Sequence, residues 1–129
     1  MKQILTLLAI STLAIILYSF SIQKNDIAAA FKQGNAQALS SDFDTVVDIQ
    51  IGSQSGKVAP REAVKKLDAF FRQNTPSGFD VVHSGEKRES GFMVGKLATS
   101  GKTYRVNITY KVANNNLIIQ SIRIDESND

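Results

Sequence analysis

His83 and Tyr104 are the two side chains of this sequence whose chemistry best fits proton transfer. His83 is the single histidine among 129 residues, and imidazole is the side chain that changes charge nearest to neutral pH. Where a fold brings the two together, His83 can act as a base and Tyr104 can donate a hydrogen bond to a developing oxyanion, with Asp48 or Asp80 as a helper. The competing interpretation is a space-filling histidine at the rim of a sheet.

Four strands must position these side chains. The sequence predicts them over residues 78–88, 92–99, 102–112 and 117–125, with a turn signal between each pair. A two-residue turn at residues 100–101 pairs Leu97 with Tyr104, and a three-residue loop at residues 89–91 places His83 opposite Leu97. A slip of one residue in the second loop would turn His83 outward and Val82 inward.

A third hairpin completes the predicted covered face. A three-residue loop at residues 114–116 pairs Tyr110 with Gln120, Ile108 with Ile122, and Val106 with Ile124. These registers predict a candidate pocket lined by His83, Tyr104, Leu97, Tyr110 and Phe71.

The opposite face of the predicted sheet mixes polar and apolar side chains. Val82, Phe92, Val94 and Ile119 fall among arginine, asparagine and threonine residues on that face. Such a mixture is more apolar than a freely exposed sheet needs to be. It favours either a homodimer through this face or scattered surface hydrophobic residues, which are common in monomers.

Helices precede this meander. Residues 26–43 are predicted to form a helix pair with Asn25 or Asp26 as the first cap and Asn35 as the second, and residues 44–51 alternate as a strand. Residues 52–59 are predicted to form a mobile loop or a short irregular strand. Pro60 then begins a helix that runs to about Gln73 with one wide apolar face.

Composition and motifs exclude several classes of function. The formal charge is +3 and basic residues alternate with acidic ones, which argues against a nucleic-acid partner. Residues 52–57 (GSQSGK) are one residue too short for a phosphate loop, so no cofactor is predicted. Asp42, Asp44 and Asp48 lie near one joint, where solvated cap and edge roles are favoured over a cation site, and no metal is predicted.

The first 21 residues are typical of an export signal. Lys2 is followed by an apolar run from residue 4 to about residue 20, and Ser19 and Ser21 stand where a cleavage site before Ile22 needs small side chains. An uncleaved membrane anchor is the alternative, because the run approaches the roughly 17–20 residues that span a bilayer. The sequence contains no cysteine, so an exported domain over residues 22–129 must be held by its core.

The order of elements, with FKQGNAQALSSDFD near the start and GKTYRVNITYKV and LIIQSIRI near the end, resembles the nuclear transport factor 2-like superfamily. Within it, the chain resembles small secreted bacterial domains of unknown function. The resemblance implies an α+β cone, in which a curved antiparallel sheet wraps N-terminal helices and one longer helix, with the strand over residues 44–51 beside the last strand. It carries over no catalytic residues.

The sequence therefore favours a non-catalytic module, periplasmic or extracellular, that binds a small apolar or amphipathic ligand or dimerises. The alternative is an isomerase or dehydratase that uses His83 and Tyr104 inside the cone, as some relatives in the superfamily use a histidine or aspartate base. Fold alone does not choose between them.

Overall fold

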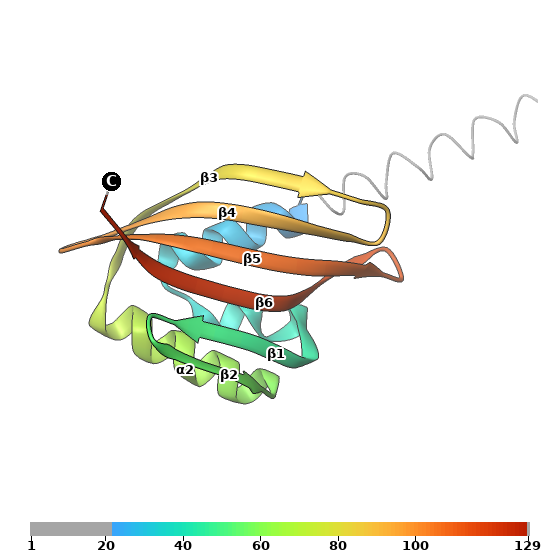
Figure 1. Ribbon diagram of the computed structural model, residues 1–129, viewed down its shortest axis with the longest axis horizontal. Coiled ribbons are helices and arrows are strands. Elements are labelled where there is room, and N and C mark those ends of the chain that lie inside the picture. Colours follow the sequence, from blue (N-terminus) through green and yellow to red (C-terminus); the bar gives the residue numbers. More distant parts are fainter. Residues whose placement is uncertain (1–21, 129) are drawn as a thin grey trace, which may run out of the picture.

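The structure, a computed structural model, describes residues 22–128 and has the predicted α+β architecture (Figure 1). The predicted export signal lies outside the described residues. A helix over residues 22–33 comes first. The remaining elements are η1 (Ala36–Asp42), β1 (Phe43–Ile51), β2 (Gln54–Val58), α2 (Pro60–Gln73), β3 (Pro76–Glu86), β4 (Ser90–Thr99), β5 (Thr103–Ala113) and β6 (Asn116–Ser127).

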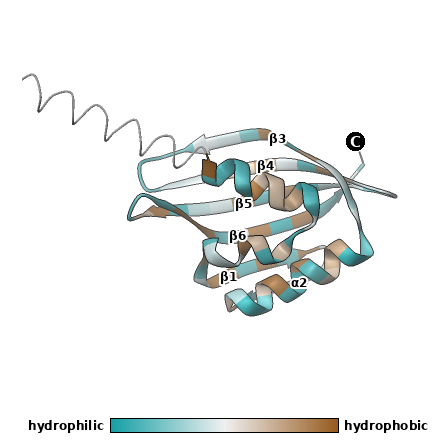
Figure 2. Cartoon of the chain, turned by 180° about the vertical axis from the view of Figure 1, so that it is seen from behind, coloured by the Kyte–Doolittle hydropathy of each residue, from teal (hydrophilic) through white to brown (hydrophobic). Residues whose placement is uncertain are grey.

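One six-stranded sheet, in the order β2-β1-β6-β5-β4-β3, organises the molecule. Neighbouring strands are antiparallel except β1 and β6, which are parallel. The predicted place of β1 beside the last strand is therefore confirmed. Figure 2 shows the helices lying over the same face of the sheet, which we call the inner face.

Helix α2 has the predicted bounds because its ends are encoded locally. Pro60 occupies the first turn with Glu62, and Arg72 lies in the last turn, where each charge complements the helix dipole. The backbone N–H of Asn74 bonds the Phe70 carbonyl and closes the helix. Its buried face consists of Ala63, Leu67, Phe70 and Phe71.

The N-terminal arm differs in part from its prediction. Gly34 takes a positive φ of 66° and ends the first helix, a conformation that suits glycine. The Asn35 side chain accepts a hydrogen bond from the Ala38 N–H at 3.2 Å, as predicted for a cap, but the element that follows is a 3-10 helix. The predicted caps Asn25 and Asp26 are wrong, because the chain is already helical at residue 22.

Strand register is confirmed in one hairpin and corrected in the two others. The β4–β5 hairpin pairs Leu97 with Tyr104, as predicted. In β5–β6 the loop has two residues, Asn114 and Asn115, both with positive φ. A bulge beside Tyr110 then restores the predicted pairs of Ile108 with Ile122 and Val106 with Ile124, but it places Ile119 rather than Gln120 opposite Tyr110.

The predicted β3–β4 register is wrong. Glu86 pairs with Gly91, so the loop between β3 and β4 begins earlier in the chain than the predicted loop at residues 89–91. Phe79 rather than His83 lies opposite Leu97. A bulge at Val82 shifts the register again, and His83 pairs with Val94. Since side chains alternate between faces, these shifts move His83 to the outer face of the sheet.

Candidate functional site

The inner face of the sheet is occupied by a continuous apolar core. Phe31 of the N-terminal helix stacks on Phe79 with 5.2 Å between ring centroids and meets Phe71 edge-on at 5.8 Å. Leu97 and Phe71, which the sequence placed at a pocket, belong to this packed core. Every buried side chain among the described residues is apolar or is the Tyr110 phenol.

His83 and Tyr104 do not form the predicted pair. The Tyr104 ring meets Phe70 edge-on at 5.0 Å on the inner face, and its hydroxyl donates to Asn74 Oδ1 at 2.8 Å. His83 is exposed on the outer face. Both residues contribute atoms to a shallow hollow of about 310 Å³, but the phenol hydroxyl is engaged on the helix side. The proposed base and its donor are therefore on opposite faces of the sheet.

Tyr110, the third polar member of the predicted pocket, ends at the rim of the core. Its hydroxyl donates to Glu86 Oε1 at 3.1 Å, and burial raises the pKa of Tyr110. Glu86 also forms an ion pair with Lys24, whose pKa is lowered by burial. This contact fastens the N-terminal helix to β3, so Tyr110 and Glu86 serve the attachment of that helix.

A second polar contact fastens the same helix to β6. The Gln23 carboxamide donates to the Leu117 carbonyl at 2.6 Å and accepts from the Leu117 N–H at 2.9 Å. One side chain thereby satisfies both backbone groups of Leu117, as a neighbouring strand would.

The carboxylates at the helix-to-strand joint have separate partners. Asp42 accepts from Gln23 Nε2 at 3.1 Å, and burial is the main cause that raises its pKa. The pKa of Asp44 is lowered, mainly by the hydrogen bond that its Oδ1 accepts from the Thr45 N–H and also by Lys111, whose Nζ lies 3.1 Å from Asp44 Oδ2. Within residues 22–128 no three possible metal ligands are clustered.

The outer face carries part of the predicted apolar patch. Val82 is 53% exposed and Phe92 is 44% exposed, while Val94, 6% exposed, lies on the same face. Ile119 is the exception, because the β5–β6 bulge turns it into the core, where it is fully buried. We call Val82, Phe92 and Val94 the outer patch.

Two hollows flank the outer patch. The hollow of about 310 Å³ beside His83 is lined in part by Val82 and Val94. A second hollow, of about 520 Å³, is lined in part by Phe92. The Phe92 ring lies over Gly85 of the neighbouring strand, so that a Cβ at Gly85 would come within 2.6 Å of the ring. The Phe92 ring therefore forms a ridge beside the two hollows along β3 and β4.

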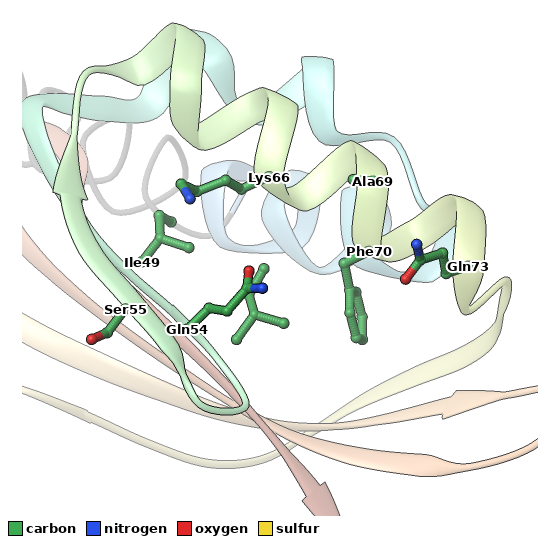
Figure 3. Close-up of a pocket in the computed structure, with 8 residues that line it drawn as sticks. Ile49, Gln54, Ser55, Lys66, Ala69, Phe70 and Gln73 are labelled. Carbon is green, nitrogen blue, oxygen red and sulfur yellow. The ribbon is translucent and has the colours of Figure 1, made fainter.

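A separate groove lies at the β2 edge of the sheet, between α2 and the strands β1 and β2 (Figure 3). Its volume is about 250 Å³. The residues that line it are Ile49, Ile51, Gln54, Ser55, Lys66, Ala69, Phe70 and Gln73. Sequence analysis did not predict this groove, because residues 52–59 were expected to form only a loop or an irregular strand and Lys66 was expected to lie on a solvated helix face.

No helix among residues 22–128 has the length and apolar character needed to cross a membrane.

Comparisons with known proteins agree on one family. Residues 24–125 match the family described as a domain of unknown function, DUF4783. A crystal structure of a DUF4783 family protein from Bacteroides ovatus is 36% identical, with a TM-score of 0.77 over 81% of this chain and 94% of that one. Another, from Bacteroides uniformis, is 34% identical, with a TM-score of 0.77 over 81% and 97% of the two chains.

More distant structures show the fold alone. An NTF2-like protein of unknown function from Silicibacter pomeroyi is 10% identical, with a TM-score of 0.61 over 95% of this chain and 98% of that chain. No curated protein matches the chain.

Proposed function

Because this chain belongs to the DUF4783 family, whose function is unknown and whose fold is nuclear transport factor 2-like, we propose that it is a non-catalytic interaction module that forms a homodimer. The outer patch, Val82, Phe92 and Val94, lies at the centre of the proposed interface. The observation that carries the proposal is the contrast between a filled inner face and an outer face on which large apolar side chains meet solvent.

The filled inner face supports a function without chemistry. An active site needs space for a substrate next to a titratable group whose partners orient it. Beneath the N-terminal helix the space between helix and sheet is taken by the core. The groove between α2 and the β1–β2 hairpin has Lys66 as the one titratable side chain in its lining, and no partner among residues 22–128 orients it. The Tyr104 and Tyr110 hydroxyls there bond Asn74 and Glu86.

The outer face is suited to a second copy of the same chain. The Phe92 ring lies across Gly85 beside the hollows, so a two-fold axis that places the outer patch of one copy on that of the other covers both rings, as an isologous interface requires. Charges of both signs surround the patch, with Asp80 opposite Lys96 and Arg105 opposite Asp125 in the strand registers. A copy related by two-fold symmetry can therefore meet each charge with its opposite.

The available area also supports a dimer. Four strands about 4.8 Å apart and about ten residues long present a flat area on the order of 600 Å², and side-chain relief enlarges it. A standard interface takes about 800 Å² from each partner.

Light scattering of the exported protein at micromolar concentration tests the proposal. We expect twice the mass of one chain, and we expect Phe92→Glu to give the mass of a single chain because it places a charge at the centre of the interface. Val46→Glu is the matched control: Val46 is 55% exposed on β1, away from the outer patch, and the variant should remain dimeric. A monomeric wild-type protein would contradict the proposal.

We also propose that the protein is exported and processed before Ile22, so that it acts in the periplasm or outside the cell. The apolar segment after Lys2 and the small residues Ser19 and Ser21 support this proposal. Gln23 makes structural bonds to Leu117, so a cleavage site further along the chain would remove a contact of the fold. The intact mass of the exported product should lack residues 1–21. Recovery of a product that retains Met1 in the membrane fraction would support the anchor instead.

A further inference from the structure

The groove between α2 and the β1–β2 hairpin has the composition of a binding site for a small amphipathic anion. We propose that it binds a monocarboxylate with a short aliphatic tail, with the tail on the floor of the groove and the carboxylate at Lys66. This site lies at the β2 edge of the sheet, whereas the outer patch lies on β3 and β4 at the opposite edge. The groove and the proposed dimer interface are therefore separate surfaces of the molecule.

The floor of the groove is apolar. Ile49 and Ile51 come from alternate positions of β1, and Phe70 comes from the helix above them. Ala69 adds only a methyl group to the helix wall, which leaves space between helix and strand. An aliphatic chain placed there removes apolar surface from water on both sides, which is the main source of affinity for such a ligand.

Four polar side chains belong to the lining around this floor: Lys66 and Gln73 from α2, and Gln54 and Ser55 from β2 (Figure 3). None of them forms a side-chain hydrogen bond or ion pair within residues 22–128. The Lys66 cation and the Gln54 carboxamide both present N–H donors that a carboxylate can accept. Gln73 lies seven residues, about 10 Å, further along α2, at the other end of the groove (Figure 3).

Lys66 and Arg61 are the two cations of α2 without an ion pair among residues 22–128, and of these Lys66 lines the groove. Lys65 pairs with Glu62 at 3.5 Å and Arg72 pairs with Asp68 at 3.0 Å. Their charges are matched within the helix, one turn apart. Lys66 is the helix cation that points along the groove, and its charge is not matched by an acidic side chain of residues 22–128. Charge complementarity therefore selects an anion as the occupant.

The size of the groove limits the ligand. A volume of about 250 Å³ equals that of about eight liquid water molecules at about 30 Å³ each. It lies below the roughly 300–1,000 Å³ of sites for drug-sized molecules. The tail is therefore short and unbranched, and octanoate is a suitable probe.

Titration by two-dimensional NMR of the uniformly 15N-labelled protein tests this inference with two probes, octanoate and octan-1-ol. The probes share a tail and differ in the carboxylate. We expect saturable shifts of amide signals in α2, β1 and β2 with octanoate, and binding of octan-1-ol weaker by about fivefold, the factor for one exposed ion pair.

Two variants and one control make the result specific. Lys66→Met should weaken octanoate to the level of octan-1-ol, whereas Lys65→Met, its neighbour on the helix, should leave octanoate binding unchanged. Ala69→Phe fills the groove from an exposed helix position and should abolish the binding of both probes, with thermal unfolding recorded to show that the variant is folded. Phe92→Glu should bind octanoate like the wild type, so the failure of the dimer proposal and the failure of this one are distinguishable.

Three outcomes would overturn the inference. One is the lack of saturable shifts at the groove with octanoate, and another is equal loss of binding in Lys65→Met and Lys66→Met, which would indicate non-specific attraction to the helix. The third is binding of both probes that Ala69→Phe does not change.

Discussion

The two faces of the sheet are made by the same strands and differ in almost every physical property. On the inner face, rows such as Leu97 with Tyr104 and Ile108 with Ile122 pack beneath the helices. On the outer face, the same strands carry mostly polar or charged side chains, with the outer patch, Ala98 and Ile118 as apolar exceptions. Side chains on the inner face belong to a close-packed interior, whereas side chains on the outer face have space to change conformation.

Glycines show this difference at single-residue resolution. Gly91 lies under the Tyr110 ring on the inner face, and Gly85 lies under the Phe92 ring on the outer face. Both glycines allow an aromatic ring to cross a neighbouring strand closely. The Tyr110 ring is held by the core and by its bond to Glu86, but the Phe92 ring is half exposed.

The largest expected effect comes from removing the same two methyl groups on either face. Val106→Ala on the inner face should lower the free energy of unfolding by about 2–3 kcal/mol through lost burial and a residual cavity. At a protein concentration low enough for the chain to be monomeric, Val82→Ala on the outer face should change the free energy of unfolding by less than about 0.5 kcal/mol. Urea unfolding at one protein concentration measures both. Equal losses would show that the outer face is as tightly packed as the inner one.

A methyl group added to each of these glycines should also lower stability more on the inner face than on the outer face, by a smaller difference than the valine substitutions give. Gly91→Ala places a Cβ about 2.5 Å from Tyr110 Cζ, and the confined ring must move, which should cost about 1–3 kcal/mol of stability. At a protein concentration low enough for the chain to be monomeric, Gly85→Ala meets the end of the Phe92 ring, which can then turn into solvent, so we expect a change within about 0.5 kcal/mol. The midpoints of thermal unfolding should separate the two variants. A Gly85→Ala protein as unstable as Gly91→Ala would mean that Phe92 is held in place, for example by a partner chain.

The smallest effect concerns the two aspartates beside the start of β1. Asp42 has a raised pKa because of burial on the helix side, so its contribution to stability is present below its ordinary pKa of 3.8 and is lost as the pH rises through the folded value. Asp44 has a lowered pKa, so its contribution is present above 3.8 and is lost as the pH falls through its folded value.

Substitution by asparagine should therefore act in opposite directions at pH 7. Asp42→Asn should raise the midpoint of thermal unfolding, since the amide keeps an acceptor for Gln23 without a charge, and Asp44→Asn should lower it. Both differences from the wild type should shrink as the pH falls toward and below 3.8. A decrease for both variants at pH 7 would show that the bond to Gln23 outweighs the burial of Asp42.

Local signals account for the parts of the fold that were predicted correctly. Pro60 and the charges at both ends define α2, and Gly34 with Asn35 defines the break in the N-terminal arm. The β4–β5 register follows from the two-residue turn at Ser100 and Gly101, where the Thr99 N–H bonds the Lys102 carbonyl at 2.9 Å. In each case residues that are neighbours in the sequence supply the interactions.

The position of candidate site residues depended on features that no short segment encodes. The position of the β3–β4 loop sets His83 opposite Val94 and so turns it outward, and the bulge at Val82 then brings Phe79 opposite Leu97, where its ring stacks on Phe31 of a distant helix. The bulge in β5–β6 likewise turns Ile119 inward beside Phe43 of β1. The groove at Lys66 exists only because α2 packs against β1 and β2.

The amino-acid sequence by itself determined the element types, the bounds of α2, the apolar rows of β4, β5 and β6 and the α+β class, because turns, caps and periodicity act over a few residues. Only the tertiary structure decided which face His83 and Ile119 occupy and where polar side chains gather around a groove. The physical reason is the period of two in a strand: one extra residue reverses the face of every side chain on one side of it, and whether that residue is accommodated is settled by packing between distant elements.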